Sequence, residues 1–144
     1  MIHYFLIVNK DGQTRLAHYT NHTPVNERST LEGELVRKCL RRRECDSNFF
    51  EHGHSTIVYR RYASLYFIVG ADDEENEMAL LEFLHCVVET FEKYFENVCE
   101  LDIMQNIERA HYIVQEMLMS GVIAETNKAN ILYPVGLLDE SKRR

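Results

Sequence analysis

The sequence predicts an α+β fold, in which a five-stranded, mostly antiparallel sheet is flanked by helices. Short apolar runs separated by turn residues occupy much of the first half of the chain, as in strands. The second half instead shows apolar residues at steps of three and four, as in amphipathic helices. The length of 144 residues, with 45% hydrophobic and 27% charged residues, suits a single globular domain over residues 1–144.

The first element is a predicted β-hairpin. Ile2–Val8 is a continuous run of β-branched, aromatic and other apolar residues, which is typical of a buried strand. Asn9–Gly12 ends in Asp-Gly, a strong hairpin signal, and Gln13–Tyr19 is expected to return as the partner strand.

A helix is expected next, ending at about Arg43. Thr23 is the expected N-cap and Pro24 the first helical residue, since proline lacks the N–H that this position leaves unpaired. The side chains expected to face inward are those of Leu31, Leu35, Val36 and Cys39.

Basic residues gather at the end of this helix, at Arg37, Lys38, Arg41, Arg42 and Arg43. Cations are favoured near a helix C-terminus, so a solvated helix end explains them. The alternative is a contact with an acidic partner surface or with lipid headgroups, where each charge contributes about 1 kcal/mol.

Three short strands should follow, over Asn48–His52, Thr56–Tyr62 and Leu65–Ala71. The last two are joined by a tight Ala63-Ser64 link. The acidic stretch Asp72–Glu77 then precedes a long helix, where carboxylates complement the helix dipole. The apolar residues predicted for one stripe of that helix are Met78, Leu81, Leu84, Val88, Phe91, Phe95 and Val98.

Asp102 is expected to cap a further helix that Gly121 ends, and a last short helix is expected near Asn127–Leu138. The residues predicted for one side of the Asp102 helix are Met104, Ile107, His111, Val114 and Leu118.

Composition and motifs exclude several function classes. The net charge of −7 gives nucleic-acid binding no overall electrostatic support. No run approaches the roughly 20 apolar residues of a membrane span, so a cytosolic protein with at most peripheral membrane contact is expected. The four cysteines form no CxxC pair and are expected to be reduced. His85 and Glu89 could share a helix face, but a zinc site needs further ligands. Nucleophile-elbow, Walker and GxGxxG motifs are missing, so we expect no catalytic residues, metal or cofactor.

Several motifs recur in an order that covers nearly the whole chain. They are MIHYFLIVNKDGQTRLAHY at the N-terminus, VYRRYASLYFIVG at 58–70, VCELDIM at 98–104 and EMLMSGVIAETNKANIL towards the C-terminus. Together they resemble the small (sigma) subunits of heterotetrameric adaptor-protein complexes, the vesicle coats that sort membrane cargo. The resemblance implies a longin-like fold, no enzymatic activity, and two large subunits and one medium subunit as partners.

The segments CELDIM, AHYIVQEM and ETNKANIL look most like adaptor complex four, which acts at the trans-Golgi network without needing clathrin. The clathrin-associated complexes one and two are the alternative, because the motifs at 58–67 and 98–102 are shared. A free-standing longin-type trafficking regulator is a further alternative. It would need a fusion helix or anchor, for which little chain remains after Leu138.

The resemblance also implies a pocket for cargo tails of the form [D/E]xxxL[L/I], with Arg15 facing the acidic residue of the signal. The positions that match the family's dileucine pocket are Ala63, Leu65, Val88, Asn97, Val98 and Ile103. The spacing of the apolar positions alone favours ordinary core packing, and only the resemblance favours a pocket. Arg15 alone would be read as a solvated strand residue.

Overall fold

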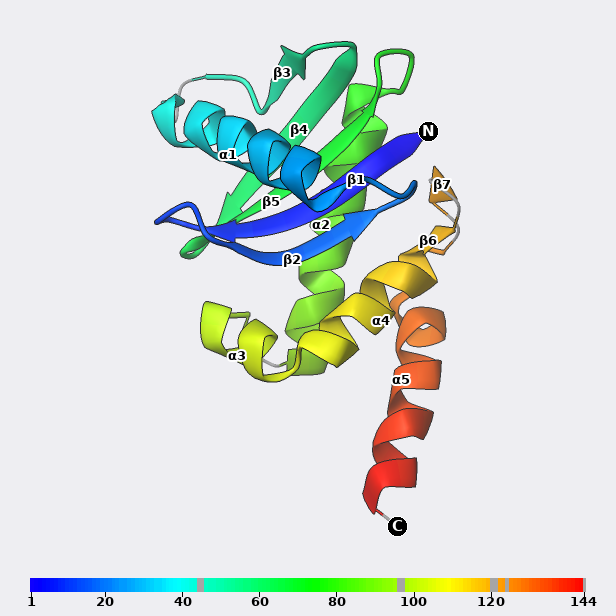
Figure 1. The fold of residues 1–144 in the computed structure, drawn as a ribbon. Helices are drawn as coiled ribbons and strands as arrows, with labels where there is room; N and C mark the ends of the chain where they lie inside the picture. The colour runs from blue at the N-terminus through cyan, green and yellow to red at the C-terminus, as the bar shows by residue number, and fades with distance from the viewer. Residues whose placement is uncertain (44–45, 96–97, 120–121, 124, 144) are drawn as a thin grey trace.

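The computed structural model describes residues 1–43, 46–95, 98–119, 122–123 and 125–143. A five-stranded sheet lies between helix α1 on one face and helices α2 and α4 on the other (Figure 1). The elements are β1 (Ile2–Asn9), β2 (Thr14–Tyr19), α1 (Val25–Arg41), β3 (Phe49–His52), β4 (Ser55–Tyr62), β5 (Leu65–Asp72), α2 (Glu77–Phe95), α3 (Glu100–Gln105), α4 (Ile107–Met117), β6 (Leu118–Met119), β7 (Val122–Ile123) and α5 (Lys128–Arg143).

The sheet has the strand order β2-β1-β5-β4-β3, and each neighbouring pair is antiparallel. The predicted α+β class and the five-stranded antiparallel sheet are therefore confirmed. Strands β1 and β5 are central and almost wholly buried, which explains why both read as continuous apolar runs. A small hairpin of β6 and β7 was not expected from the sequence.

Alternate residues of the central strands enter two separate cores. Phe5 and Ile7 of β1 pack with Phe67 of β5 in the larger core, beneath α2, α4 and α5. Leu6 of β1 and Ile68 of β5 point the other way, into the smaller core beneath α1. This division follows from the two-residue period of a strand, whose side chains alternate between faces.

Gly70 on β5 allows one close contact in the smaller core. It pairs with Tyr4 across the β1–β5 ladder, and the Tyr4 ring lies over its Cα. A Cβ at position 70 would meet the ring at 2.2 Å, which is well inside van der Waals contact. Glycine is therefore required here for space, although glycine generally weakens a strand.

Replacing Gly70 with alanine should lower the free energy of unfolding by about 1–3 kcal/mol, because the Tyr4 ring must move off its packing site. Chemical denaturation would measure the change. Gly136→Ala is the matched control, since a Cβ at Gly136 meets nothing within 4 Å. A Gly70→Ala protein as stable as the control variant would contradict this account of the contact.

The start of α1 differs from the sequence prediction. The N-cap is Pro24 and not Thr23, whose hydroxyl donates to the Asn21 carbonyl at 3.2 Å. Leu35, Val36 and Cys39 are buried as predicted, whereas Leu31 is only partly buried against the same core.

The apolar stripe of α2 is also rotated relative to the prediction. Leu84, Val88 and Phe91 are buried as expected, but Met78 is 59% exposed and Leu81 only partly buried. The residues that fill the core in addition are Leu80, Phe83 and Val87. Apolar residues are frequent enough along α2 that more than one stripe fits the three- and four-residue steps, so spacing alone did not select the buried one.

The following helix begins earlier than expected and is interrupted. Cys99 is the N-cap of the short helix α3, so Asp102 lies inside a helix and does not start one. A break at Asn106 separates α3 from α4, whose last residue is Met117. The predicted stop at Gly121 lies outside the described residues.

Helix α5 is longer than predicted and extends away from the sheet (Figure 1). Its first half is anchored by Ile131 and Val135, which are buried in the larger core. Further along, Asp139 accepts hydrogen bonds from the Tyr94 hydroxyl and from Arg109 Nε, both at 2.8 Å. These contacts join α5 to α2 and α4.

Candidate functional site

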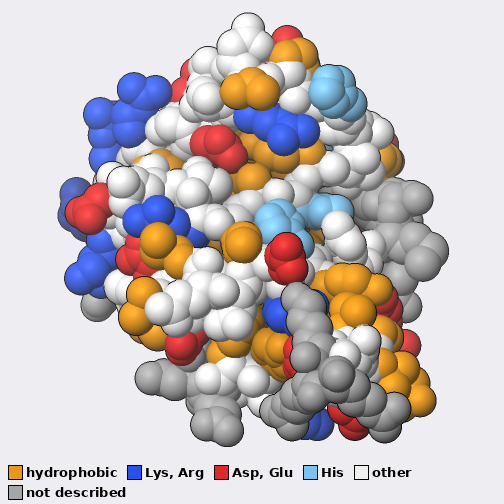
Figure 2. All heavy atoms as spheres, turned by 60° about the horizontal axis from the view of Figure 1, so that its bottom comes forward, with side chains coloured by type: hydrophobic (Ala, Val, Ile, Leu, Met, Phe, Trp, Pro, Cys, Tyr) orange, Lys and Arg blue, Asp and Glu red, His pale blue; other side chains and the backbone are white. Residues whose placement is uncertain are grey.

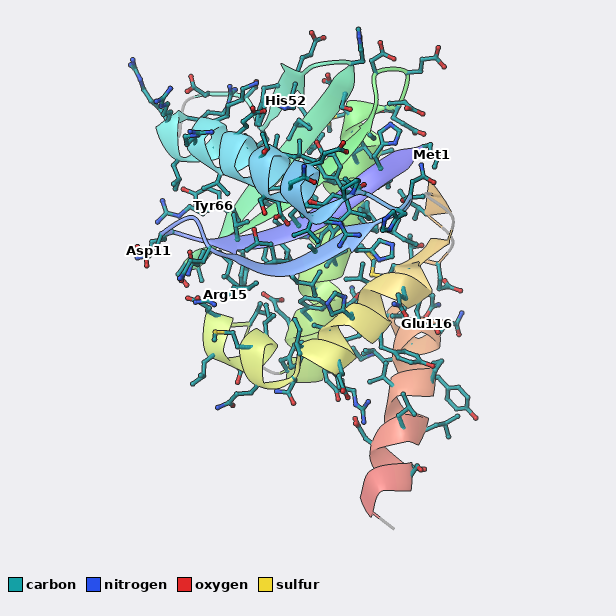
Figure 3. The ribbon with its side chains drawn as sticks, in the orientation of Figure 1. Met1, Asp11, Arg15, His52, Tyr66 and Glu116 are labelled. Carbon is teal, nitrogen blue, oxygen red and sulfur yellow. The ribbon has the colours of Figure 1, made fainter. Side chains whose placement is uncertain are left out.

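The candidate site lies at one end of the sheet, where β1 runs into the β1–β2 turn and β5 leaves the β4–β5 turn. Asn9 pairs with Leu65 in the β1–β5 ladder, so the two turns are adjacent. Figure 3 shows Asp11 at the tip of the first turn and Arg15 on β2, between the sheet and α3. Helix α3 therefore covers this end of the sheet.

The structure brings most of the predicted pocket residues together. Leu65, Val88, Val98 and Ile103 belong to the larger core, although they come from β5, α2, the segment before α3, and α3 itself. None is more than 4% exposed. A leucine side chain has no free surface to contact at these four residues, so the candidate pocket is closed in this conformation.

Two predicted residues stand apart from that cluster. Ala63 is exposed at the tip of the β4–β5 turn and lines no interior surface. Asn97 lies outside the described residues.

Arg15 is not free, contrary to its reading as a solvated strand residue. Its Nε donates to Glu100 Oε1 at 2.6 Å, and its Nη2 donates to Gln13 Oε1 at 2.8 Å. Glu100 is the first residue of α3, so the ion pair joins β2 to the helix that covers the site. Both side chains are about one quarter exposed, at 25% and 28%.

Asn9 organises the same network and was not singled out from the sequence. It is 4% exposed, and its Nδ2 donates to Glu100 Oε1 at 2.8 Å and to Gln13 Oε1 at 2.9 Å. Its Oδ1 accepts the backbone N–H groups of Asp11 and Gln13, which fixes the β1–β2 turn. The buried amide is thus fully engaged, and it holds Glu100 in front of Arg15.

The hydrogen bond from Asn9 and then the one from Arg15 lower the pKa of Glu100 below its usual value. Glu100 is therefore ionised in the folded protein, and it supplies the negative charge that Arg15 faces. Chemically, the site is a cation already paired with an internal carboxylate, beside a closed apolar cluster.

The β4–β5 turn beside the site has a strained backbone. Ala63 has a φ of 53°, in the left-handed region that residues with a Cβ rarely adopt. The flanking Tyr62 side chain donates to Glu92 of α2, and this bond raises the pKa of the tyrosine hydroxyl. The turn is thereby tied to α2.

Ala63→Gly should raise the free energy of unfolding by about 0.5–1 kcal/mol, because glycine adopts a positive φ without the Cβ strain of alanine. Denaturant unfolding of the two proteins would measure it. Ser64→Gly changes the neighbouring turn residue, whose φ is not positive. This substitution should therefore not stabilise the protein. Equal effects of the two substitutions would refute the strain argument.

The other candidate chemistry remains unsupported. His85 Nε2 does contact Glu89 on α2, but Glu89 also forms an ion pair with Lys128. The other ring nitrogen of His85, Nδ1, contacts the Arg60 guanidinium. Within the described part of the chain, no three histidine, cysteine or carboxylate side chains are grouped as metal ligands.

The fold and the sequence together define a class of protein. The family model described as clathrin adaptor complex small chain matches residues 1–142, so the chain belongs to this family. It is 57% identical over 140 residues to the AP-4 complex subunit sigma of Arabidopsis thaliana, covering 97% of this chain and 98% of the relative. It is 47% identical to the AP-4 complex subunit sigma-1 of Homo sapiens, covering 97% of each. The resemblance to adaptor sigma subunits, and to that of complex four, is confirmed.

More distant relatives include the AP-1 complex subunit sigma-1 of Schizosaccharomyces pombe, at 40% identity over 93% of this chain and 83% of the relative. In three dimensions the chain is similar to one in a homology model of the full-length AP-3 complex in a stretched open conformation. The TM-score is 0.79 at 27% identity, covering 99% of this chain and 96% of the other. This similarity confirms the fold of an adaptor small subunit.

Proposed function

We propose that residues 1–144 form one domain, the sigma subunit of an AP-4-type heterotetramer with two large subunits and one medium subunit. The complex would sort membrane cargo at the trans-Golgi network, and this subunit would have no catalytic role. The observation that carries the proposal is the full-length similarity to AP-4 sigma subunits, at higher identity than to the AP-1 relatives. That difference favours complex four over complexes one and two.

Exposed apolar side chains support an assembled state. The large apolar residues that are exposed at the surface include Met78, Leu101, Met104, Tyr112, Tyr133 and Leu137. Figure 2 shows hydrophobic side chains open to solvent on the face that it presents. Where such side chains form a contiguous patch, they mark surfaces that partner chains cover. Across the described ranges, no helix combines the length and the apolar character that a membrane span requires.

Affinity purification of this chain from its native cells, followed by mass spectrometry, tests the assignment. We expect two large chains and one medium chain in stoichiometric amounts, and their identities would distinguish complex four from complexes one and two. A monomer, or co-purifying fusion and tethering proteins, would instead favour the free-standing longin-type regulator.

We further propose that the site binds acidic dileucine signals after α3 moves. Glu100 forms with Arg15 the ion pair that the acidic residue of a signal would form. The cargo signal must therefore displace this internal carboxylate. Movement of α3 would withdraw Ile103 from the larger core, to which Leu65 and Val88 also belong, and would open space beside them. Burial of each signal leucine would contribute about 1.5–3 kcal/mol, offset by the cost of opening.

Two substitutions separate the charged and apolar parts of this mechanism. Glu100→Gln should tighten binding of an ExxxLL peptide to the assembled complex about three- to tenfold, because Arg15 loses its internal charge partner. Val88→Asp should abolish binding, because it places an unpaired charge among apolar side chains. Fluorescence anisotropy of a labelled peptide measures both.

Glu116→Gln is the matched control, since it removes the same charge near the end of α4, far from Arg15 (Figure 3). It should leave peptide affinity unchanged. Peptide binding that is indifferent to Val88→Asp in a complex that still assembles would remove the pocket from the proposal and leave the subunit assignment intact.

A further inference from the structure

A second candidate site lies at the outer edge of β4, around the arginines that follow α1 and those near the end of β4. A hollow of about 470 Å³ is lined by residues of α1, the segment after it, β4, β5 and α2. Its lining residues are Cys39, Arg42, Arg43, Asp46, Asn48, Tyr59, Arg60, Arg61, Tyr66 and Leu81. Among the described residues, four arginines and one carboxylate therefore border a space large enough for a small-molecule ligand.

The hollow exists because β3 is shorter than β4. The β3–β4 ladder begins at Phe49 opposite Val58, and Asn48 accepts one more bond from the Tyr59 N–H at 3.0 Å. Beyond Tyr59, β4 still pairs with β5, but on its other side it has no strand among the described residues. N–H groups of alternate residues point to the same edge, so the Arg61 N–H is directed into this open space.

Two of the four arginines of the hollow have hydrogen-bond partners within the protein, and the other two are available to bind a ligand. Arg42 is structural, since it donates to the Ser47 carbonyl at 2.7 Å and to the Tyr59 hydroxyl at 3.0 Å. Arg60 is partly engaged, with Nη1 3.2 Å from His85 Nδ1.

Arg43 and Arg61 are exposed, and their guanidinium groups have no hydrogen bond or ion pair within the described ranges. The Arg61 guanidinium lies 5.9 Å from the centre of the Tyr66 ring, which orients it. The lining carboxylate, Asp46, accepts the Arg43 backbone N–H at 2.8 Å and so belongs to the chain turn.

We propose that this hollow binds a compact anion that carries several phosphate groups. Guanidinium groups bind phosphate oxygens bidentately, and two available arginines flanking an outward backbone N–H would hold adjacent phosphates. An added peptide strand fits less well. The open part of β4 is only Arg60–Tyr62, shorter than a usual strand, and arginine side chains at an edge discourage strand pairing. The same phosphate chemistry occurs in soluble inositol polyphosphates and in phosphoinositide headgroups.

The test is isothermal titration of inositol hexakisphosphate into the full chain, repeated with Arg43→Gln/Arg61→Gln. The double substitution should weaken binding by at least about tenfold, since two bidentate contacts are lost. The matched control is Arg37→Gln/Arg41→Gln, which removes two exposed charges from α1 that lie outside the hollow. It should change affinity by no more than about threefold at near-physiological salt, where distant charges are screened. Thermal unfolding would verify that both variants are folded.

A second arm uses phosphatidylcholine vesicles with and without phosphatidylinositol bisphosphate, measured by flotation. Binding that depends on Arg43 and Arg61 supports the site. Such binding with the soluble ligand alone indicates a free inositol polyphosphate, whereas such binding with the vesicles as well indicates a phosphoinositide headgroup. Equal losses in the two double variants would show attraction by overall charge only and would overturn the proposal. The proposal would also be overturned if the unaltered chain bound neither probe. It would be overturned, too, if the chain bound a phosphopeptide that inositol hexakisphosphate does not displace.

Discussion

The antiparallel pairing of β1 with β5 is the constraint on which the rest of the structure depends. It joins residues 2–9 to residues 65–71, and the other three strands of the five-stranded sheet attach outside this pair. Because both strands are buried on both faces, each face needs its own helical cover. Helix α1 supplies one cover, and α2 with α4 supplies the other, so one pairing creates two cores. Gly70, which admits the Tyr4 ring, shows how closely the two strands are fitted.

The same pairing sets the geometry of the candidate cargo site. It brings the end of β1 beside the start of β5, and Asn9 then fixes Glu100 against Arg15 through side-chain bonds. A short helix is thus tied by its first residue to a β-hairpin. Of the six residues of α3, Ile103 is the one that is buried. This combination of a polar tie and one buried apolar side chain is the reason that we propose α3 as the moving part of the site.

Much of the fold could be predicted from the sequence, because strand runs and turn residues are local signals. The five strands of the main sheet coincide with the predicted runs, such as Ile2–Val8 and Leu65–Ala71. No end differs from its prediction by more than one residue. The buried stripe of α2 and the break at Asn106 depend on packing against other elements, which spacing does not encode. The pairing of Arg15 with Glu100 could not be foreseen, since 85 residues separate them and only the tertiary fold brings them together.

Helix α1 is held to the sheet unevenly, and this affects how the protein opens. Of its 17 residues only Leu35, Val36 and Cys39 are fully buried, all in its second half. We therefore expect α1 to open from the sheet at a lower free energy than the larger core, which would stay intact. Arg42, immediately after α1, fastens the following segment to Tyr59 of β4. A ligand that bridges Arg43 and Arg61 would span the same junction, and mass action would then couple its binding to the closure of α1. Amide exchange of α1 would in that way report occupancy of a site that α1 only borders.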